Sequence, residues 1–151
     1  MKRIFMITAL IMLLASPALA QTNIRWINVE DGPPTLAWDP VTLNADGVPL
    51  PATEVVKYEC FLANAITDPG KTNPAMITAA PIVATEFAVD LGGVEGKYFA
   101  GVRAIRTLND DRLRDGDMSW SDNPEVVADG VPFGLKLYAK PALPGQLVIT
   151  E

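Results

Sequence analysis

The chain has 151 residues, a formal net charge of −6, one cysteine and no histidine. An acidic chain is a poor partner for nucleic acid or for an anionic membrane surface, because both attract clustered lysine and arginine. The missing histidine excludes Ser–His–Asp and Cys–His catalysis and most zinc sites. A lone Cys60 excludes an intramolecular disulfide, and no cofactor motif is present, so we expect no cofactor.

Residues 1–20 have the three-part pattern of a secretory signal peptide. Lys2 and Arg3 precede an apolar run over residues 4–15, and small residues precede a cut after Ala20. The run is shorter than the roughly 20 residues that span a bilayer. We therefore expect cleavage after Ala20 and a periplasmic or extracellular protein without a membrane anchor. The 131 residues that remain would have a net charge of −8, since two basic residues leave and no acid does.

Short runs of alternating apolar and polar residues follow, separated by turns that contain proline and glycine. We expect strands within residues 23–29, 35–38, 54–64, 86–91, 96–105 and 118–127. In residues 96–105, Tyr98 and every second residue after it should face the core, with Arg103 outward. The charged residues 107–117 are expected to form a polar loop. Short strands at this spacing predict an all-β sandwich or barrel with almost no helix.

The segments TLAWDP, YECFL, FAVDL, YFAGVRA and SWS occur in the order found in a fibronectin type III domain, and residues 23–129 resemble that family. The resemblance implies an immunoglobulin-like β-sandwich of about seven strands. It also implies one buried group formed by Trp38, Tyr58, Tyr98 and Val102. Tyr98 would be the tyrosine corner, whose hydroxyl bonds to backbone upstream. Gly101 is unusual inside a central strand and predicts a bulge.

The resemblance divides the chain into three parts. The signal peptide covers residues 1–20, and the fibronectin type III-like domain covers residues 21–129. The remaining residues, 130–151, form a C-terminal extension in which we expect one or two short strands.

The charged segment matches the loop between the sixth and seventh strands of the family, which often carries ligand contacts. The candidate binding residues are Asp110, Asp111, Arg112, Arg114, Asp115, Asp117 and Trp120. Closely spaced carboxylates suit a calcium ion, but the interspersed arginines oppose one and the spacing fits no EF-hand loop. A solvated loop is the alternative, and we assign no metal site.

Trp120 lies in SWS, which resembles half of the Trp-Ser motif of cytokine-receptor domains. We expect Trp120 to lie over the guanidinium of Arg103 and stabilise the sheet, with sugar stacking by Trp120 or Trp26 as the alternative. Asp110 and Asp117 are conceivable as the acid and base of a glycosidase. Because a small sandwich offers no deep cleft, we expect no enzymatic activity.

The C-terminal extension is too apolar for an exposed tail. Its candidate assembly residues are Phe133, Leu135, Leu137, Leu147, Val148 and Ile149. These side chains need a cover, and strand-like backbone needs an edge on which to pair. Either the extension folds back onto its own sandwich, or it adds as a strand to a neighbouring subunit.

These observations predict an exported, non-enzymatic β-sandwich module that acts in binding, adhesion or ligand presentation, as fibronectin type III domains do. A protein or a surface glycan would be its ligand, and nucleic acid would not. The alternative is a structural subunit that assembles into an oligomer or filament through its C-terminal strand segment.

Overall fold

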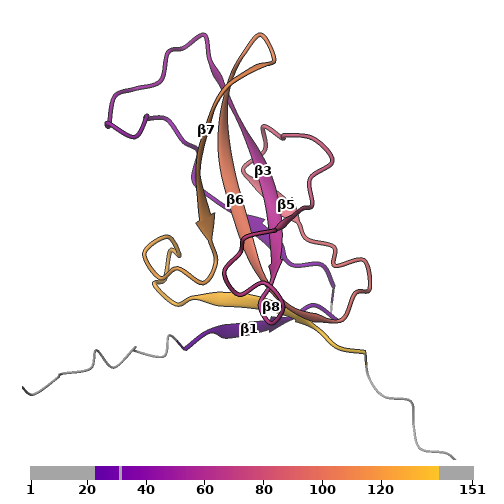
Figure 1. The fold of residues 1–151 in the computed structure, drawn as a ribbon. Coiled ribbons are helices and arrows are strands. Elements are labelled where there is room, and N and C mark those ends of the chain that lie inside the picture. Colours follow the sequence, from indigo (N-terminus) through magenta and orange to yellow (C-terminus); the bar gives the residue numbers. More distant parts are fainter. Residues whose placement is uncertain (1–22, 31, 140–151) are drawn as a thin grey trace, which may run out of the picture.

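The computed structural model describes residues 23–30 and 32–139, which form strands and turns without a helix (Figure 1). The prediction of an all-β fold is therefore confirmed. None of the described residues belongs to a helix long and apolar enough to cross a membrane. The predicted signal peptide, its cleavage site and the apolar residues Leu147, Val148 and Ile149 lie outside the described residues.

A mixed sheet of six strands forms the larger part of the fold. Its strands are β1 (Arg25–Asn28), β3 (Val55–Asn64), β4 (Ala75–Met76), β6 (Gly96–Leu108), β7 (Asp111–Trp120) and β8 (Phe133–Leu137). The antiparallel pair of β3 and β6 is the centre, and β4 lies on the other side of β3. Both β7 and β8 pair with the remaining side of β6, and β1 pairs with β8 in parallel.

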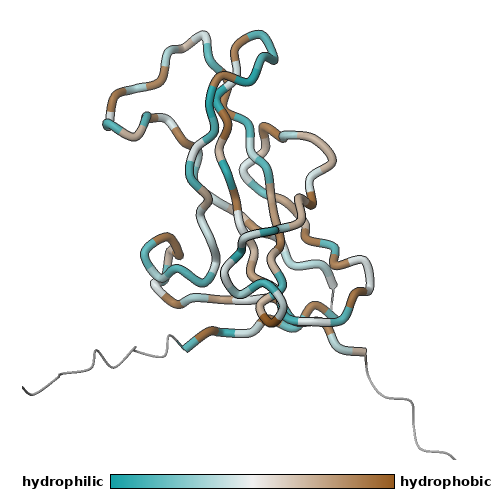
Figure 2. Tube along the Cα trace, in the orientation of Figure 1, coloured by the Kyte–Doolittle hydropathy of each residue, from teal (hydrophilic) through white to brown (hydrophobic). Residues whose placement is uncertain are grey.

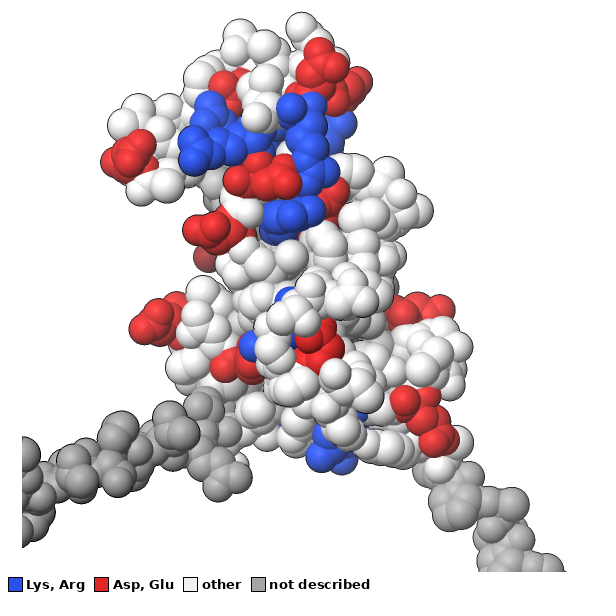
Figure 3. Space-filling model, in the orientation of Figure 1, with Lys and Arg blue, Asp and Glu red and all other residues white. Residues whose placement is uncertain are grey.

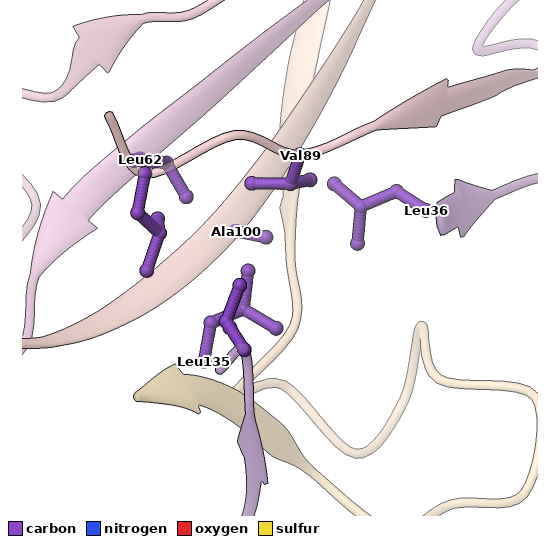
Figure 4. Packing of buried hydrophobic residues seen from close by; sticks show 7 residues of the cluster. Leu36, Leu62, Val89, Ala100 and Leu135 are labelled. Atoms are coloured by element: carbon purple, nitrogen blue, oxygen red, sulfur yellow. The ribbon is translucent and has the colours of Figure 1, made fainter. Parts of the chain in front are cut away.

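A second sheet consists of β2 (Thr35–Ala37) and β5 (Glu86–Ala88), which are antiparallel. Side chains from both sheets meet in one hydrophobic core (Figure 4). The core residues labelled in Figure 4 are Leu36, Leu62, Val89, Ala100 and Leu135. Because β2 and β5 have three residues each and β3 has ten, the small sheet can cover only part of the large one.

The central strand β6 confirms some of the predicted packing and corrects the rest. Ala100 faces the core, and the Tyr98 hydroxyl donates to the carbonyl oxygens of Val94 and Glu95 at 3.5 and 3.4 Å, as expected of a tyrosine corner. Tyr58 is buried, and its ring centroid lies 5.3 Å from that of Trp38. Trp38, Tyr98 and Val102 are only partly buried, so the predicted buried group of four is wrong in that respect.

The predicted polar loop over residues 107–117 is also wrong. β6 continues to Leu108 and β7 begins at Asp111, so the turn between them is only Asn109 and Asp110. Both turn residues have positive φ, 51° and 68°, which is the conformation of a two-residue type I′ hairpin turn. The charged residues after the turn therefore lie on a strand that pairs with β6.

Gly101 is not at a bulge. It pairs regularly with Phe61 on one side and Trp120 on the other, while the register shifts lie further along, between Arg103 and Ile105 and between Arg106 and Thr107. A Cβ atom at position 101 would lie 2.8 Å from the ring of Trp120. The glycine is needed because this ring packs directly on the backbone of β6.

Candidate functional site

Four charged side chains pair on the outer face of the large sheet, which is the face turned away from the core. We call Glu59, Arg103, Arg112 and Asp115 the ionic cluster. The buried Glu59 carboxylate accepts hydrogen bonds from Arg103 Nη2 at 2.6 Å and Arg112 Nη1 at 2.8 Å. Arg112 Nη2 also donates to Asp115 at 2.7 Å. Figure 3 shows basic residues around acidic ones in the upper half of this face, where β3, β6 and β7 run together.

The ionic cluster is electrostatically satisfied. Burial alone would raise the pKa of Glu59, but hydrogen bonds from Arg112 and Arg103 outweigh burial and hold this pKa below its ordinary value. A hydrogen bond from Arg112 lowers the pKa of Asp115, and bonds to Asp115 and Glu59 raise the pKa of Arg112. Each member of the cluster thus has a partner of opposite charge. The cluster ties β3, β6 and β7 together and leaves few free groups for a ligand.

The four carboxylates considered as calcium ligands do not converge on one point. Lys57 Nζ donates to Asp110 at 2.7 Å, Asp115 belongs to the ionic cluster, and Asp117 lines a cavity on the opposite face of the sheet. Asp111 is exposed. Within residues 23–30 and 32–139, no group of three or more such side chains is placed to hold a metal ion.

Trp120 does not stack on Arg103. The guanidinium of Arg103 lies 5.1 Å from the ring centroid of Phe61, whereas Lys71 Nζ lies 5.7 Å from the ring centroid of Trp120. Lys71 also forms an ion pair with Asp122 at 2.6 Å. The cation–π contact predicted for Trp120 therefore exists with a different cation. Sequence reasoning missed Lys71 because it lies in a loop about 50 residues away.

A concavity lies on the core side of the β6–β7 hairpin, where the small sheet does not reach. This cavity of about 460 Å³, which we call the hairpin hollow, lies between residues 38–46 and the inner face of β3, β6 and β7. Its aromatic residues are Trp38 and Tyr58. The remaining residues that line it are Asp39, Val41, Leu43, Asn44, Ala45, Asp46, Val56, Val102, Ala104, Arg106, Arg114, Asp115, Gly116, Asp117 and Ser119.

Residues 38–46, which cover the hairpin hollow, are fixed by hydrogen bonds at Val41 and within the turn that begins at Asn44. Tyr58 Oη accepts a hydrogen bond from the backbone N–H of Val41 at 2.8 Å. Asn44 Oδ1 accepts from the N–H groups of Asp46 and Val48 at 3.0 and 2.9 Å. The segment nevertheless exposes apolar side chains, including Leu43, and it appears with several brown stretches at the upper left of Figure 2. On this side the mouth of the hollow therefore carries the apolar Val41 and Leu43 beside polar residues of the same segment.

The opposite rim of the hairpin hollow is polar. Arg114 and Asp117 come from β7, and Arg106 is held by two hydrogen bonds to Glu54 at 2.6 and 2.8 Å. Trp38 lines the hollow from the other side, and its buried indole Nε1 has no hydrogen-bond partner among the described residues. A group that stacks on aromatic rings and carries oxygen atoms suits such a hollow.

The structure separates the predicted binding residues. Arg114 and Asp117 line the hairpin hollow, whereas Arg112 pairs on the outer face and Asp110 pairs at the hairpin tip. Asp115 also borders the hollow, but its carboxylate bonds to Arg112 in the ionic cluster. Sequence reasoning missed Trp38, Tyr58 and Arg106 as site residues. The two aromatic residues had been assigned to the core, and no local signal shows that the covering sheet ends before it reaches them.

The described assembly residues lie within the chain's own sheet. Leu135 is fully buried between β1 and β6, and Phe133 and Leu137 pack partly buried against the core. This part of the extension folds back, as one of the two alternatives predicted. Leu147, Val148 and Ile149 lie beyond the described residues.

Comparisons of the chain with models of known protein families, with curated proteins and with solved structures found no match.

Proposed function

We propose that the chain is an exported, non-enzymatic binding module with an immunoglobulin-like, fibronectin type III-like β-sandwich, and that its ligand site is the hairpin hollow. The division of the strands supports this fold. β2 and β5 correspond to strands B and E, and β3, β6 and β7 correspond to strands C, F and G. One strand departs from the constant-type arrangement: β1 joins β8 in the large sheet and does not pair with β2.

The observation that carries the binding role is the composition of the hollow. Its volume of about 460 Å³ is in the range of small-ligand sites, and an aromatic floor faces a rim of charged side chains. The floor suits a sugar ring or an apolar side chain of a protein, while Arg114 and Asp117 suit the polar groups of either. The ligand would then be a surface glycan or a protruding segment of a protein.

The arrangement of carboxylates favours binding over glycoside hydrolysis. Asp110 pairs with Lys57 at the hairpin tip, while Asp117 lies in the hollow, so the two acids proposed as a catalytic pair do not face one space. A glycosidase needs two carboxyl groups that flank one bond, with the pKa of the acid raised. Three other acids line the hollow, namely Asp39, Asp46 and Asp115. The pKa of Asp115 is lowered because it accepts hydrogen bonds from Arg112, which is the opposite of what a general acid needs.

Ligand arrays test the proposal. Labelled protein, purified after export, would be applied to arrays of oligosaccharides and of peptides, together with variants matched in pairs. Val41→Glu places a charge at the mouth of the hollow, and Val48→Glu places one in the same segment outside it. Arg114→Gln alters the rim, and Asp111→Asn alters an exposed residue of the same strand that does not line the hollow.

We expect Val41→Glu and Arg114→Gln to weaken binding at least about tenfold, a cost of roughly 1.4 kcal/mol, with the two controls unchanged. A ligand that binds all five proteins equally would place the site elsewhere. The absence of binding on both arrays would contradict the binding role.

A second candidate function, the assembling subunit, is favoured by one observation. The edge of β2 that faces away from β5 has no partner strand among the described residues.

A further inference from the structure

A groove runs beside the unpartnered edge of β2. It has a volume of about 710 Å³, and we call it the side groove. Leu36, Ala37 and Trp38 form one wall, and Ala100 and Val102 of β6 lie at its base. The opposite wall is formed by residues 119–121, 126–129 and Phe133. The groove therefore separates the small sheet from the β7 side of the large sheet, and its lining is largely apolar.

The backbone of β2 is oriented to accept another strand in this groove. The N–H of Trp38 donates to Thr85 at 3.0 Å, and the carbonyl of Pro34 accepts from Val89 at 2.9 Å. With Leu36 opposite Phe87, these bonds direct the polar groups of residues 34, 36 and 38 toward β5. Backbone groups of successive residues in a strand point to opposite sides. The N–H and C=O groups of Thr35 and Ala37 therefore point toward the open edge.

The chain contains a segment with the pattern that this edge requires. Residues 146–150, QLVIT, place Leu147 and Ile149 on one face of an extended strand, with Gln146, Val148 and Thr150 on the other. Two large apolar side chains would enter the groove over Ala100, Val102 and Phe133. The length also fits, because the exposed edge extends from Thr35 to Asp39.

The groove of the same chain is difficult for this segment to reach. β8 starts at Phe133, beside the groove, and runs away from it to Leu137, which pairs with Gly96. If the chain stays extended to Ala139, it ends about 20 Å from Phe133. The next six residues, 140–145, would have to reverse direction and cover that distance, although Pro141 and Pro144 restrict them. A second copy meets no such restriction.

We infer that residues 146–150 of one copy occupy the side groove of a second copy, as an added strand on β2. Leu147 and Ile149 enter the groove, and the backbone pairs with Thr35 and Ala37. This contact joins two different surfaces, so it is head-to-tail and can continue into rings or filaments. The inference does not depend on a ligand in the hairpin hollow.

Sedimentation of the full exported chain tests the inference through two complementary variants. Leu147→Asp places a charge on the face of the added strand that would enter the groove, so this variant should no longer donate its strand to a second copy. Ala37→Pro removes an N–H from the open edge of β2 without touching the bonds to β5, and proline is tolerated at sheet edges. Each variant has a matched control. Thr150→Asp, the control for Leu147→Asp, adds the same charge on the face of the strand that points away from the groove. Ala37→Val, the control for Ala37→Pro, changes the side chain but keeps the backbone N–H.

We expect the unmodified chain and both controls to form species larger than a monomer, in proportions that rise with concentration. Leu147→Asp and Ala37→Pro should each be monomeric alone. Mixed together they should form a single dimer, because each retains the half of the contact that the other has lost. The dimer would also show that both variants are folded. A monomeric unmodified chain would overturn the inference, as would an equal mixture of the two variants that stays monomeric.

Discussion

The contact between Gly101 and Trp120 predicts a stability change whose sign depends on the second residue. A Cβ atom added at position 101 would lie 2.8 Å from two ring carbons of Trp120 and 3.1 Å from the sulfur of Met118. Gly101 is not among the glycines with positive φ, so alanine can adopt its backbone conformation. The clash with the ring is then the main cost. Gly101→Ala should destabilise the protein by about 1–3 kcal/mol through overpacking.

Removal of the ring should reverse this effect. In a Trp120→Ala background the close neighbour that remains is the Met118 sulfur at 3.1 Å, which belongs to a flexible side chain that can shift. Alanine is then favoured over glycine in a strand by roughly 0.5–1 kcal/mol. The two substitutions should therefore be coupled by about 1.5–4 kcal/mol. Urea unfolding of the four proteins, followed by far-UV circular dichroism, measures this coupling. If Gly101→Ala cost the same in both backgrounds, the glycine would be required for a reason other than the ring.

Three further outcomes follow from the sequence and the structure. Export should produce a chain that begins at Gln21, and an intact mass that still includes Met1 would contradict the signal peptide. Trp38→Ala should cost about 3 kcal/mol, the low end for an aromatic residue because Trp38 is only partly buried, and a loss below about 1 kcal/mol would contradict its packing on the core. The pKa of Glu59 is lowered in the folded state, so its contribution to stability is present above its ordinary pKa of 4.5 and is lost as the pH falls through the folded value. Urea unfolding at a series of pH values should thus show a smaller acid-side loss for Glu59→Gln than for the unmodified chain, and equal losses would contradict the role of the ionic cluster.

The strands that the sequence predicts well are those with one buried face. In β3 and β6 every second residue faces the core, so the alternation of apolar residues is visible in the sequence. The tyrosine corner predicted at Tyr98 agrees with the hydrogen bonds from its hydroxyl to the carbonyl oxygens of Val94 and Glu95. The first seven residues of β7, 111–117, were predicted as a loop for the opposite reason. The residues of β7 are mostly exposed and charged, so a strand held by backbone pairing and by ion pairs to Glu59 resembles a loop in sequence.

The candidate site could be predicted only in part, because it depends on where elements end. The pattern placed Arg114, Asp115 and Asp117 near a binding surface, and all three line the hairpin hollow. Trp38 and Tyr58 look like core residues in any local pattern. They form the floor of the hollow because β2 and β5 stop after three residues, and the length of a covering sheet is not encoded near the residues it covers.

The central proposal, that the hairpin hollow binds the ligand, can be tested at a single atom. The indole N–H of Trp38 is buried and has no acceptor among the described residues, and the chain has only two other tryptophans, Trp26 and Trp120. A ligand found on the arrays would be titrated into ¹⁵N-labelled protein while the three indole resonances are followed. We predict that the Trp38 resonance shifts most and saturates with the binding curve. A shift confined to Trp26 or Trp120, with Trp38 unchanged at saturation, would contradict the proposed site.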